Sequence, residues 1–292
     1  MLKRLSLILS VNKVFVKYFY MRRIIYFESM TKYRLFLSRE SSELGKLYFK
    51  WQAYWGYTRH GGGLKATKEL AKLCRIDKGK YVLDVGCGVG ATACYIAKKY
   101  GCRVIGVDIL KKMVEWANKR AKEKGIEDKV EFKIADVQSL PFKDVLFDAA
   151  IGEAVISFVK DKRKAIEECI RVVKQGGYVG FNEPTWIKEP PLNIVEYYFH
   201  AAGARPETPE GWIELLKGSG LRDIIMRIHR LSFLNILDEI KMYSLRDLLR
   251  AAYRFLSLYV KNPELRRYMK ELPRPPRNIL EYLGYGIYVG RK

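Results

Sequence analysis

The sequence predicts an α/β protein with a doubly wound, mostly parallel sheet. Five short apolar runs have the length of strands, and they cover residues 81–85, 103–107, 130–134, 147–152 and 177–183. Segments with helical periodicity separate most of them, at 64–75, 90–100, 111–124 and 161–173. Strands that alternate with helices form a parallel sheet covered on both faces, and ligands bind at the carboxyl ends of its strands.

A glycine cluster follows the first predicted strand. Asp84 ends the apolar run, and Gly86, Gly88 and Gly90 come at alternate positions after it. Glycines let the backbone pass close to a ligand, and the amides of the helix that begins there face the same ligand. Asp108, at the end of the second strand, lies where a carboxylate accepts ribose hydroxyls. Gly86-x-Gly88-x-x-Ala91 also fits the loose dinucleotide fingerprint, so the cluster alone leaves the nucleotide open.

Acidic residues at three further places favour S-adenosylmethionine over NAD. Asp84 suits an ammonium group and would repel a pyrophosphate. Asp136, in Ala-Asp-Val after the third strand, can accept a hydrogen bond from an adenine amino group. Phe147-Asp148 opens the fourth strand, which ends in Gly152-Glu153-Ala154. In this order the motifs resemble those of class I S-adenosylmethionine-dependent methyltransferases that act on small molecules and lipids, and the resemblance is close over residues 64–184.

The resemblance implies a seven-stranded sheet that ends in an antiparallel hairpin, with helical lid insertions before the last strand. It also implies a division into four parts, which are a basic extension (1–30), an aromatic cap (31–63), the cofactor-binding core (64–184), and lid helices with the final strands (185–292).

The family's cofactor residues carry over position by position. Asp84, Gly86, Cys87 and Gly88 would surround the methionine part of S-adenosylmethionine, and Gly90 would allow close helix packing. Asp108 would hold the ribose, Ile109 would pack on the adenine, and Asp136 with Val137 would contact the adenine edge. Glu153 would contact the cofactor and face the transferred methyl group. The sequence there is "GEAV" rather than the Asn/Asp-Pro-Pro-aromatic motif of nucleic-acid amino methyltransferases, which counts against base methylation.

The segment before the core, "KWQAYWGYTRHGGG", resembles the entry segment of small-molecule and lipid methyltransferases. Tyr57 and His60 are candidate catalytic residues, since an aromatic face attracts a sulfonium and an imidazole can act as a general base. Trp51 and Trp55 are candidate pocket walls. The alternatives are aromatic residues that belong to the core, and a capping or surface histidine.

The chain after the fifth strand continues with helices and two more strands. Gly176-Gly177 is interpreted as the turn before that strand, and "NEPTWIKEPP" after it places Glu183, Thr185 and Trp186 at the cofactor edge of the sheet. The later elements are predicted at 192–203, 209–218, 222–231, 236–271 and 284–292. The helices before the last strand are interpreted as a substrate-selecting lid, with a packing or dimer surface as the alternative.

The net charge of +22 is concentrated near the N-terminus, where residues 1–80 carry 18 Lys/Arg against 5 Asp/Glu. Such a charge attracts anionic lipid, nucleic acid or an acidic metabolite, or it reflects a hot or salty cytosol. Residues 1–30 are either a basic interfacial anchor that binds anionic membranes or the product of a start codon upstream of Met21 or Met30. No stretch reaches the length of a transmembrane helix.

Five cysteines without a CxxC pair predict free thiols in a reducing cytoplasm and no metal site. Three functions remain open. The leading one is S-adenosylmethionine-dependent methylation of a small molecule or lipid headgroup, in the cytoplasm or at the membrane periphery. The alternative is a methyltransferase for RNA or protein, which only the charge favours. A cofactor-binding protein without catalysis is the third, and a titration with the cofactor would separate it from the other two.

Overall fold

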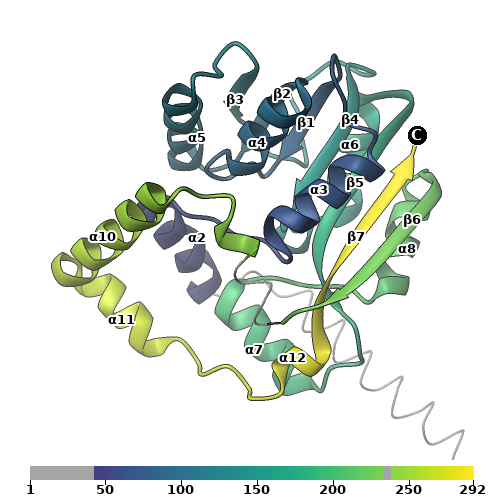
Figure 1. Ribbon diagram of the computed structural model, residues 1–292. Coiled ribbons are helices and arrows are strands. Elements are labelled where there is room, and N and C mark those ends of the chain that lie inside the picture. The colour runs from purple at the N-terminus through teal and green to yellow at the C-terminus, as the bar shows by residue number, and fades with distance from the viewer. Residues whose placement is uncertain (1–42, 233–237) are drawn as a thin grey trace, which may run out of the picture. The chain divides into compact units, whose positions relative to one another are not determined.

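Seven strands form one sheet in the order β3-β2-β1-β4-β5-β7-β6, as seen in a computed structural model that describes residues 43–232 and 238–292 (Figure 1). The strands span Tyr81–Val85 (β1), Arg103–Asp108 (β2), Val130–Ile134 (β3), Phe147–Glu153 (β4), Val173–Trp186 (β5), Arg222–Arg230 (β6) and Leu283–Arg291 (β7). The first five are parallel, and β7 is antiparallel to both of its neighbours. The fold class predicted from the sequence is therefore confirmed.

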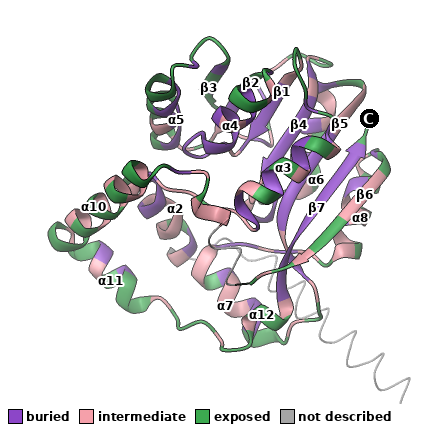
Figure 2. Cartoon of the chain, in the orientation of Figure 1, coloured by how far each residue is buried: buried purple, intermediate pink, exposed green. Residues whose placement is uncertain are grey.

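Helices cover both faces of the sheet because the strands are apolar on both sides. Val82 packs with one face cluster and the next residue, Leu83, with the other, as side chains of a strand alternate. The first face is covered by α3 (Gly63–Leu73), α4 (Ala91–Tyr100) and α5 (Lys111–Lys124). The second is covered by α6 (Lys162–Val172) and α8 (Pro209–Gly218). Figure 2 shows the central strands as an almost continuous buried layer.

The remaining helices lie beside this core. They are α2 (Glu43–Trp55), the 3₁₀ turn η1 (Ile156–Phe158), α7 (Leu192–Ala202), α10 (Leu245–Lys261), α11 (Pro263–Glu271) and α12 (Ile279–Tyr282). Helix α2 contacts α7, α10 and α11. Ser244 begins α10 with a capping box to Asp247, and Asn262 accepts hydrogen bonds from two backbone amides at the start of α11.

Two local predictions were wrong. The described part of the helical segment predicted over 236–271 is not one helix: helical residues at 238–240 are followed by α10 and α11, because Pro263 cannot continue α10 and instead opens α11. Gly176-Gly177 is not a turn between helix and strand. Strand β5 starts directly after α6, and the pair lies in an irregularity where the pairing jumps from Phe147↔Val173 to Ala149↔Tyr178.

The predicted extension at 1–30 lies outside the described residues, and the described parts of the other three predicted divisions lie within one compact unit. Within residues 43–232 and 238–292, no helix is long and apolar enough to cross a membrane. The same ranges contain no group of three His, Cys, Asp or Glu side chains that could hold a metal ion. All five cysteines are buried free thiols.

Candidate active site

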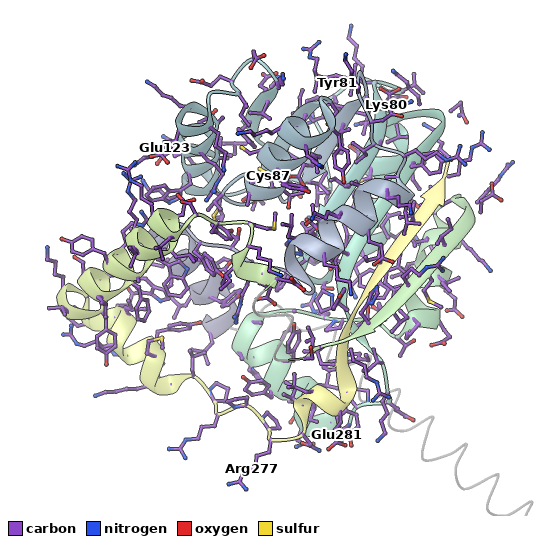
Figure 3. The ribbon with its side chains drawn as sticks, in the orientation of Figure 1. Lys80, Tyr81, Cys87, Glu123, Arg277 and Glu281 are labelled. Carbon is purple, nitrogen blue, oxygen red and sulfur yellow. The ribbon has the colours of Figure 1, made fainter. Side chains whose placement is uncertain are left out.

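The glycine loop joins the carboxyl end of β1 to the first turn of α4, and its backbone takes a form that requires glycine. Gly86 and Gly90 have φ angles of +63° and +72°. A Cβ at Gly86 would lie 2.5 Å from the Val155 side chain, and one at Gly90 would lie 2.9 Å from both Ala117 and Phe132. The loop is therefore held tightly between β4, α5 and β3, with its backbone fixed for a ligand. Cys87, labelled in Figure 3, is buried within this loop.

Asp84 is a buried carboxylate that has no cationic partner among residues 43–232 and 238–292. Its side chain is 2% exposed, and Oδ2 accepts no hydrogen bond from the described residues. Burial, with further contributions from the negative charges of Glu153 and Asp108, raises the pKa of Asp84 well above its ordinary value. A cationic ligand would relieve both the desolvation and the repulsion. The residues present thus fit a ligand that brings an ammonium or sulfonium group to this edge of the sheet.

Asp108 connects the second strand to the glycine loop. Its Oδ2 accepts a hydrogen bond from the Gly88 amide at 2.9 Å, and its Oδ1 accepts one from Leu110 at 2.9 Å. Burial raises the pKa of this carboxyl, while the two amides act in the opposite direction. Each carboxylate oxygen keeps a further lone pair for a hydroxyl. Ile109, which follows directly, leaves an apolar side chain 64% exposed at the sheet edge.

The adenine-edge candidates behave differently from one another. Asp136 accepts a hydrogen bond from the Gln138 amide at 2.8 Å, so its carboxylate is fixed in a tight turn. The side chain of Val137 is 6% exposed and packs in the core. The Val137 side chain therefore belongs to the core and is not available to contact a ligand.

Glu153, at the end of β4, is the centre of a buried polar network. Its Oε2 accepts hydrogen bonds from Thr92 at 2.6 Å and Thr67 at 3.0 Å, and it lies 3.2 Å from His60 Nε2. Oε1 has only longer contacts, 3.2 Å from Thr67 and 3.3 Å from Asn182. Both of these donors have a shorter bond elsewhere, to Oε2 and to the Gly61 carbonyl. Oε1 is thus the carboxylate oxygen with free capacity to accept a hydrogen bond.

His60 is held between this carboxylate and Asn182. The Asn182 Nδ2 group lies 3.1 Å from His60 Nδ1 and donates to the Gly61 carbonyl at 2.9 Å. With the amide in this orientation, Nδ1 accepts a hydrogen bond and the Nε2 proton faces Glu153. The imidazole is 10% exposed, so the alternative of a surface histidine is wrong.

The aromatic segment before α3 covers the glycine loop. A Cβ at Gly88 would lie 3.0 Å from the Thr58 side chain, and the Thr58 carbonyl accepts a hydrogen bond from Tyr243. The Tyr57 ring is 4.7 Å from the Tyr243 ring and packs near Val89 of the loop. Burial raises the pKa of Tyr57 to about 12, so its hydroxyl stays protonated near neutral pH.

Two tryptophans proposed as pocket walls have other surroundings. Trp51 is 1% exposed and packs with Leu265 and Tyr268 of α11. Trp55 lies against Phe255 of α10. Both belong to the packing of α2 against α10 and α11, which was the alternative interpretation of these aromatic residues.

Glu183, Thr185 and Trp186 of β5 are buried. Glu183 accepts hydrogen bonds from the amides of Val155, Ile156 and Ser157 and from the Ser157 hydroxyl. It fixes the turn that follows Glu153, where Ala154 has φ +54°. Thr185 and Trp186 are 0% and 1% exposed, so all three support the site edge from within.

Sequence reasoning missed three residues of the network, Thr67, Thr92 and Asn182. Thr67 lies on α3 and Thr92 in the first turn of α4, next to the glycine loop. Asn182 is paired with Glu153 in the sheet register. That register offers the one usable signal, because residues that end neighbouring parallel strands lie at the same edge.

Comparison with known proteins relates the core of the chain to one family. Residues 83–181 match the family described as "Methyltransferase domain". A maize protein named phosphoethanolamine N-methyltransferase 1 is 30% identical over 180 residues, which are 61% of this chain and 35% of that protein. The matches span between 34% and 66% of the length of seven curated relatives.

Solved structures share the fold at low identity. Phosphoethanolamine N-methyltransferase 2 of Haemonchus contortus, in complex with S-adenosyl-L-methionine, superposes with a TM-score of 0.61 at 21% identity, over 83% of this chain and 56% of that one. The [4+2]-cyclase SpnF superposes with a TM-score of 0.62 at 22% identity, over 87% and 97%. The fold alone therefore does not fix the reaction. The match over residues 83–181 confirms the methyltransferase family that the motifs predicted for this core.

Proposed function

We propose that this class I methyltransferase transfers a methyl group from S-adenosylmethionine to an amine nitrogen of a small molecule or lipid headgroup. The observation that carries the proposal is the buried Glu153 carboxylate, which has one oxygen held by Thr92, Thr67 and His60 and the other with spare capacity. A carboxylate in this environment binds an ammonium or amine strongly. The relatives named phosphoethanolamine N-methyltransferases support the same acceptor class.

The cofactor residues are also part of this proposal. Asp84 would hold the amino group of S-adenosylmethionine, and Asp108 would hold its ribose. Gly86, Cys87 and Gly88 would line the loop, while Ile109, Asp136 and the backbone of Val137 would meet the adenine. Gly90 would act through packing alone. When bound, S-adenosylmethionine supplies an electrophilic methyl group on a sulfonium.

The residues of the chain would bind and orient the acceptor and exclude water from the reacting groups. Glu153 Oε1 would accept a hydrogen bond from the acceptor nitrogen and hold its proton as the nitrogen becomes nucleophilic. His60, Thr67 and Thr92 keep the carboxylate in one orientation. Tyr57 and Thr58 cover the glycine loop and keep the reacting groups dry.

Arg59 would recognise an anionic group on the acceptor. Its guanidinium is exposed, and its ion pair with Glu239 is long, at 3.9 Å. It follows Thr58 and precedes His60, so it lies in the segment that covers the site. A phosphorylated amine or a phospholipid headgroup offers the amine for Glu153 and the phosphate for Arg59.

The cysteines suggest the compartment. All five are buried thiols, which is typical of proteins from a reducing cytoplasm. Peripheral contact with an anionic membrane is compatible with the same location, and a surface for it is described below.

Transfer of labelled methyl from S-adenosylmethionine tests the proposal. We expect labelled product with phosphoethanolamine or phosphatidylethanolamine and none with RNA or protein. Glu153→Gln should lower kcat by about 10²–10⁴-fold, the range for loss of a general acid–base group. Label that enters only RNA or protein would overturn the acceptor class. An unchanged kcat in Glu153→Gln would overturn the role of Glu153.

A further inference from the structure

Helix α10 presents a continuous apolar face to solvent. Five large side chains at spacings of four, four, three and four residues are between 61% and 73% exposed, and these are Leu245, Leu249, Tyr253, Leu256 and Val260. We call them the outer face of α10. The opposite side of the helix is satisfied, since Leu248, Phe255 and Leu258 pack in clusters with α2 and α11. No residue of α10 is fully buried. In Figure 2 the helix stands at the side of the core with much of its surface exposed.

Large apolar side chains that are exposed side by side on one helix face mark an interaction surface. Helix α10 has two apolar sides: one packs against the protein, and the other faces solvent. Its 17 residues cannot cross a membrane, which excludes insertion as a spanning helix.

Basic side chains border the outer face. Arg246 and Lys261 are exposed on the next strip of the helical surface, and Arg250 on the same strip pairs with Glu123 of α5 at 3.0 Å. Farther along the chain, Arg267, Lys270, Arg274 and Arg277 are exposed, and Figure 3 shows Arg277 projecting from the loop after α11. Residues 245–280 carry nine Lys/Arg against three Asp/Glu. The surface is therefore apolar at its centre and cationic at its border.

An apolar centre with a cationic border fits an anionic membrane better than a second copy of this chain. In a two-fold dimer through α10, the border of one copy would meet the same basic border of its partner, and like charges would oppose the contact. An anionic bilayer receives apolar side chains at the acyl boundary and cationic side chains at the headgroups. We propose that the outer face of α10 docks the protein on anionic membranes.

Docking through α10 would bring the candidate active site to the membrane. The residues just before the helix belong to the site cover, since Tyr243 donates a hydrogen bond to the Thr58 carbonyl and Met242 Sδ lies 3.9 Å from Thr67 Oγ1. The surface itself lies outside the site, so the inference does not rest on the proposed acceptor.

Vesicle flotation of the full chain tests the inference. We expect binding to vesicles of phosphatidylcholine with one quarter phosphatidylglycerol and weak binding to phosphatidylcholine alone. Leu249→Ser/Tyr253→Ser/Leu256→Ser should lower the partition coefficient at least about tenfold, because three large apolar groups no longer enter the interface. The matched control, Ile134→Ser/Val145→Ser, removes two side chains that are 53% and 50% exposed elsewhere and should bind as the wild type does.

A second variant keeps the test independent of folding. Arg246→Gln/Lys261→Gln should lower binding to anionic vesicles about tenfold, and in 1 M salt the variant and the wild type should bind equally. The control Lys98→Gln/Lys99→Gln on α4 should bind as the wild type does. Wild-type binding by both α10 variants, or a dimer that the serine variant converts to a monomer in sedimentation velocity, would overturn the inference. Binding of S-adenosylhomocysteine should stay unchanged in all four variants, which separates this result from a failure of the proposed reaction.

Discussion

The Nε2 atom of His60 lies 3.2 Å from Oε2 of Glu153, and the two side chains are 10% and 4% exposed. The two residues come from different parts of the chain, since His60 precedes α3 and Glu153 ends β4. In the proposed reaction, His60 would act on the acceptor only through the carboxylate that it orients, as a positioning residue.

Replacement of His60 should lower turnover without loss of the cofactor. His60→Ala removes one of the donors to Oε2, and we expect kcat to fall about 10–100-fold, as is usual when a supporting hydrogen bond is lost. KM for the acceptor should change little. His229→Ala is a matched control, since His229 also lies 3.2 Å from a glutamate, which is Glu69 rather than Glu153. Equal effects of the two variants on kcat would contradict a positioning role.

The charge of Asp84 should cost stability and support binding. Because its pKa in the folded protein is raised, its contribution to stability is complete below the ordinary value of 3.8 and is lost as the pH rises through the folded pKa. Asp84→Asn should therefore be more stable than the wild type at pH 8, with a free energy of unfolding higher by about 1–3 kcal/mol. This difference in unfolding free energy should become smaller in acid.

The same variant should bind S-adenosylhomocysteine more weakly, by about 1–3 kcal/mol, because a charge-assisted hydrogen bond to its amino group is lost. Calorimetry together with urea unfolding at several pH values measures both effects. A variant that is less stable at every pH and binds normally would remove Asp84 from the site.

Gly90 should be far more sensitive to substitution than Gly125. Both have left-handed backbone angles, φ +72° and +60°, so alanine strains either one by a similar amount, roughly 1–2 kcal/mol. At Gly125 a Cβ meets nothing within 4 Å, whereas at Gly90 it would meet Ala117 and Phe132 at 2.9 Å. Gly90→Ala should lose about 1–3 kcal/mol more, from overpacking. Urea denaturation of both variants decides the point, and equal losses would show that the loop repacks freely.

Glu183→Gln should destabilise the turn after β4. The carboxylate accepts four hydrogen bonds, and a glutamine places an amide donor against those donors. We expect a loss of about 1–3 kcal/mol in unfolding free energy and faster hydrogen exchange at residues 155–157. Glu189→Gln, at an exposed position, is the control and should leave both unchanged. Retained protection at 155–157 would mean that the turn does not depend on the charge.

Most elements of the fold follow from local sequence. The strand at 81–85 and the helix at 111–124 have the predicted bounds, because an apolar run stops at a glycine loop in one case and a left-handed Gly125 ends the helix in the other. The start of β5 could not be predicted, since glycines at 176 and 177 indicate a turn until the pairing with β4 is known.

Some residues of the candidate site could likewise be predicted from local sequence, and others could not. Asp84, the glycines and Asp108 follow each other along one strand–helix–strand unit, so their order alone suggested a nucleotide site. The contact between His60 and Asn182 joins residues 122 positions apart. It depends on the sheet register and on the path of the segment before α3, and neither is visible in local sequence.

The position of β7 has a consequence for synthesis of the chain. This strand follows β6 in sequence but lies between β5 and β6, and it is hydrogen-bonded to both. As the polypeptide leaves the ribosome, β5 has an open edge and β6 has no neighbour until residues 283–291 emerge. Unpaired edges of this kind recruit other strands, so the nascent protein passes through a stage that is prone to aggregation and to capture by chaperones. Closure of the sheet is then a late step of folding, in which β7 enters the slot between β5 and β6.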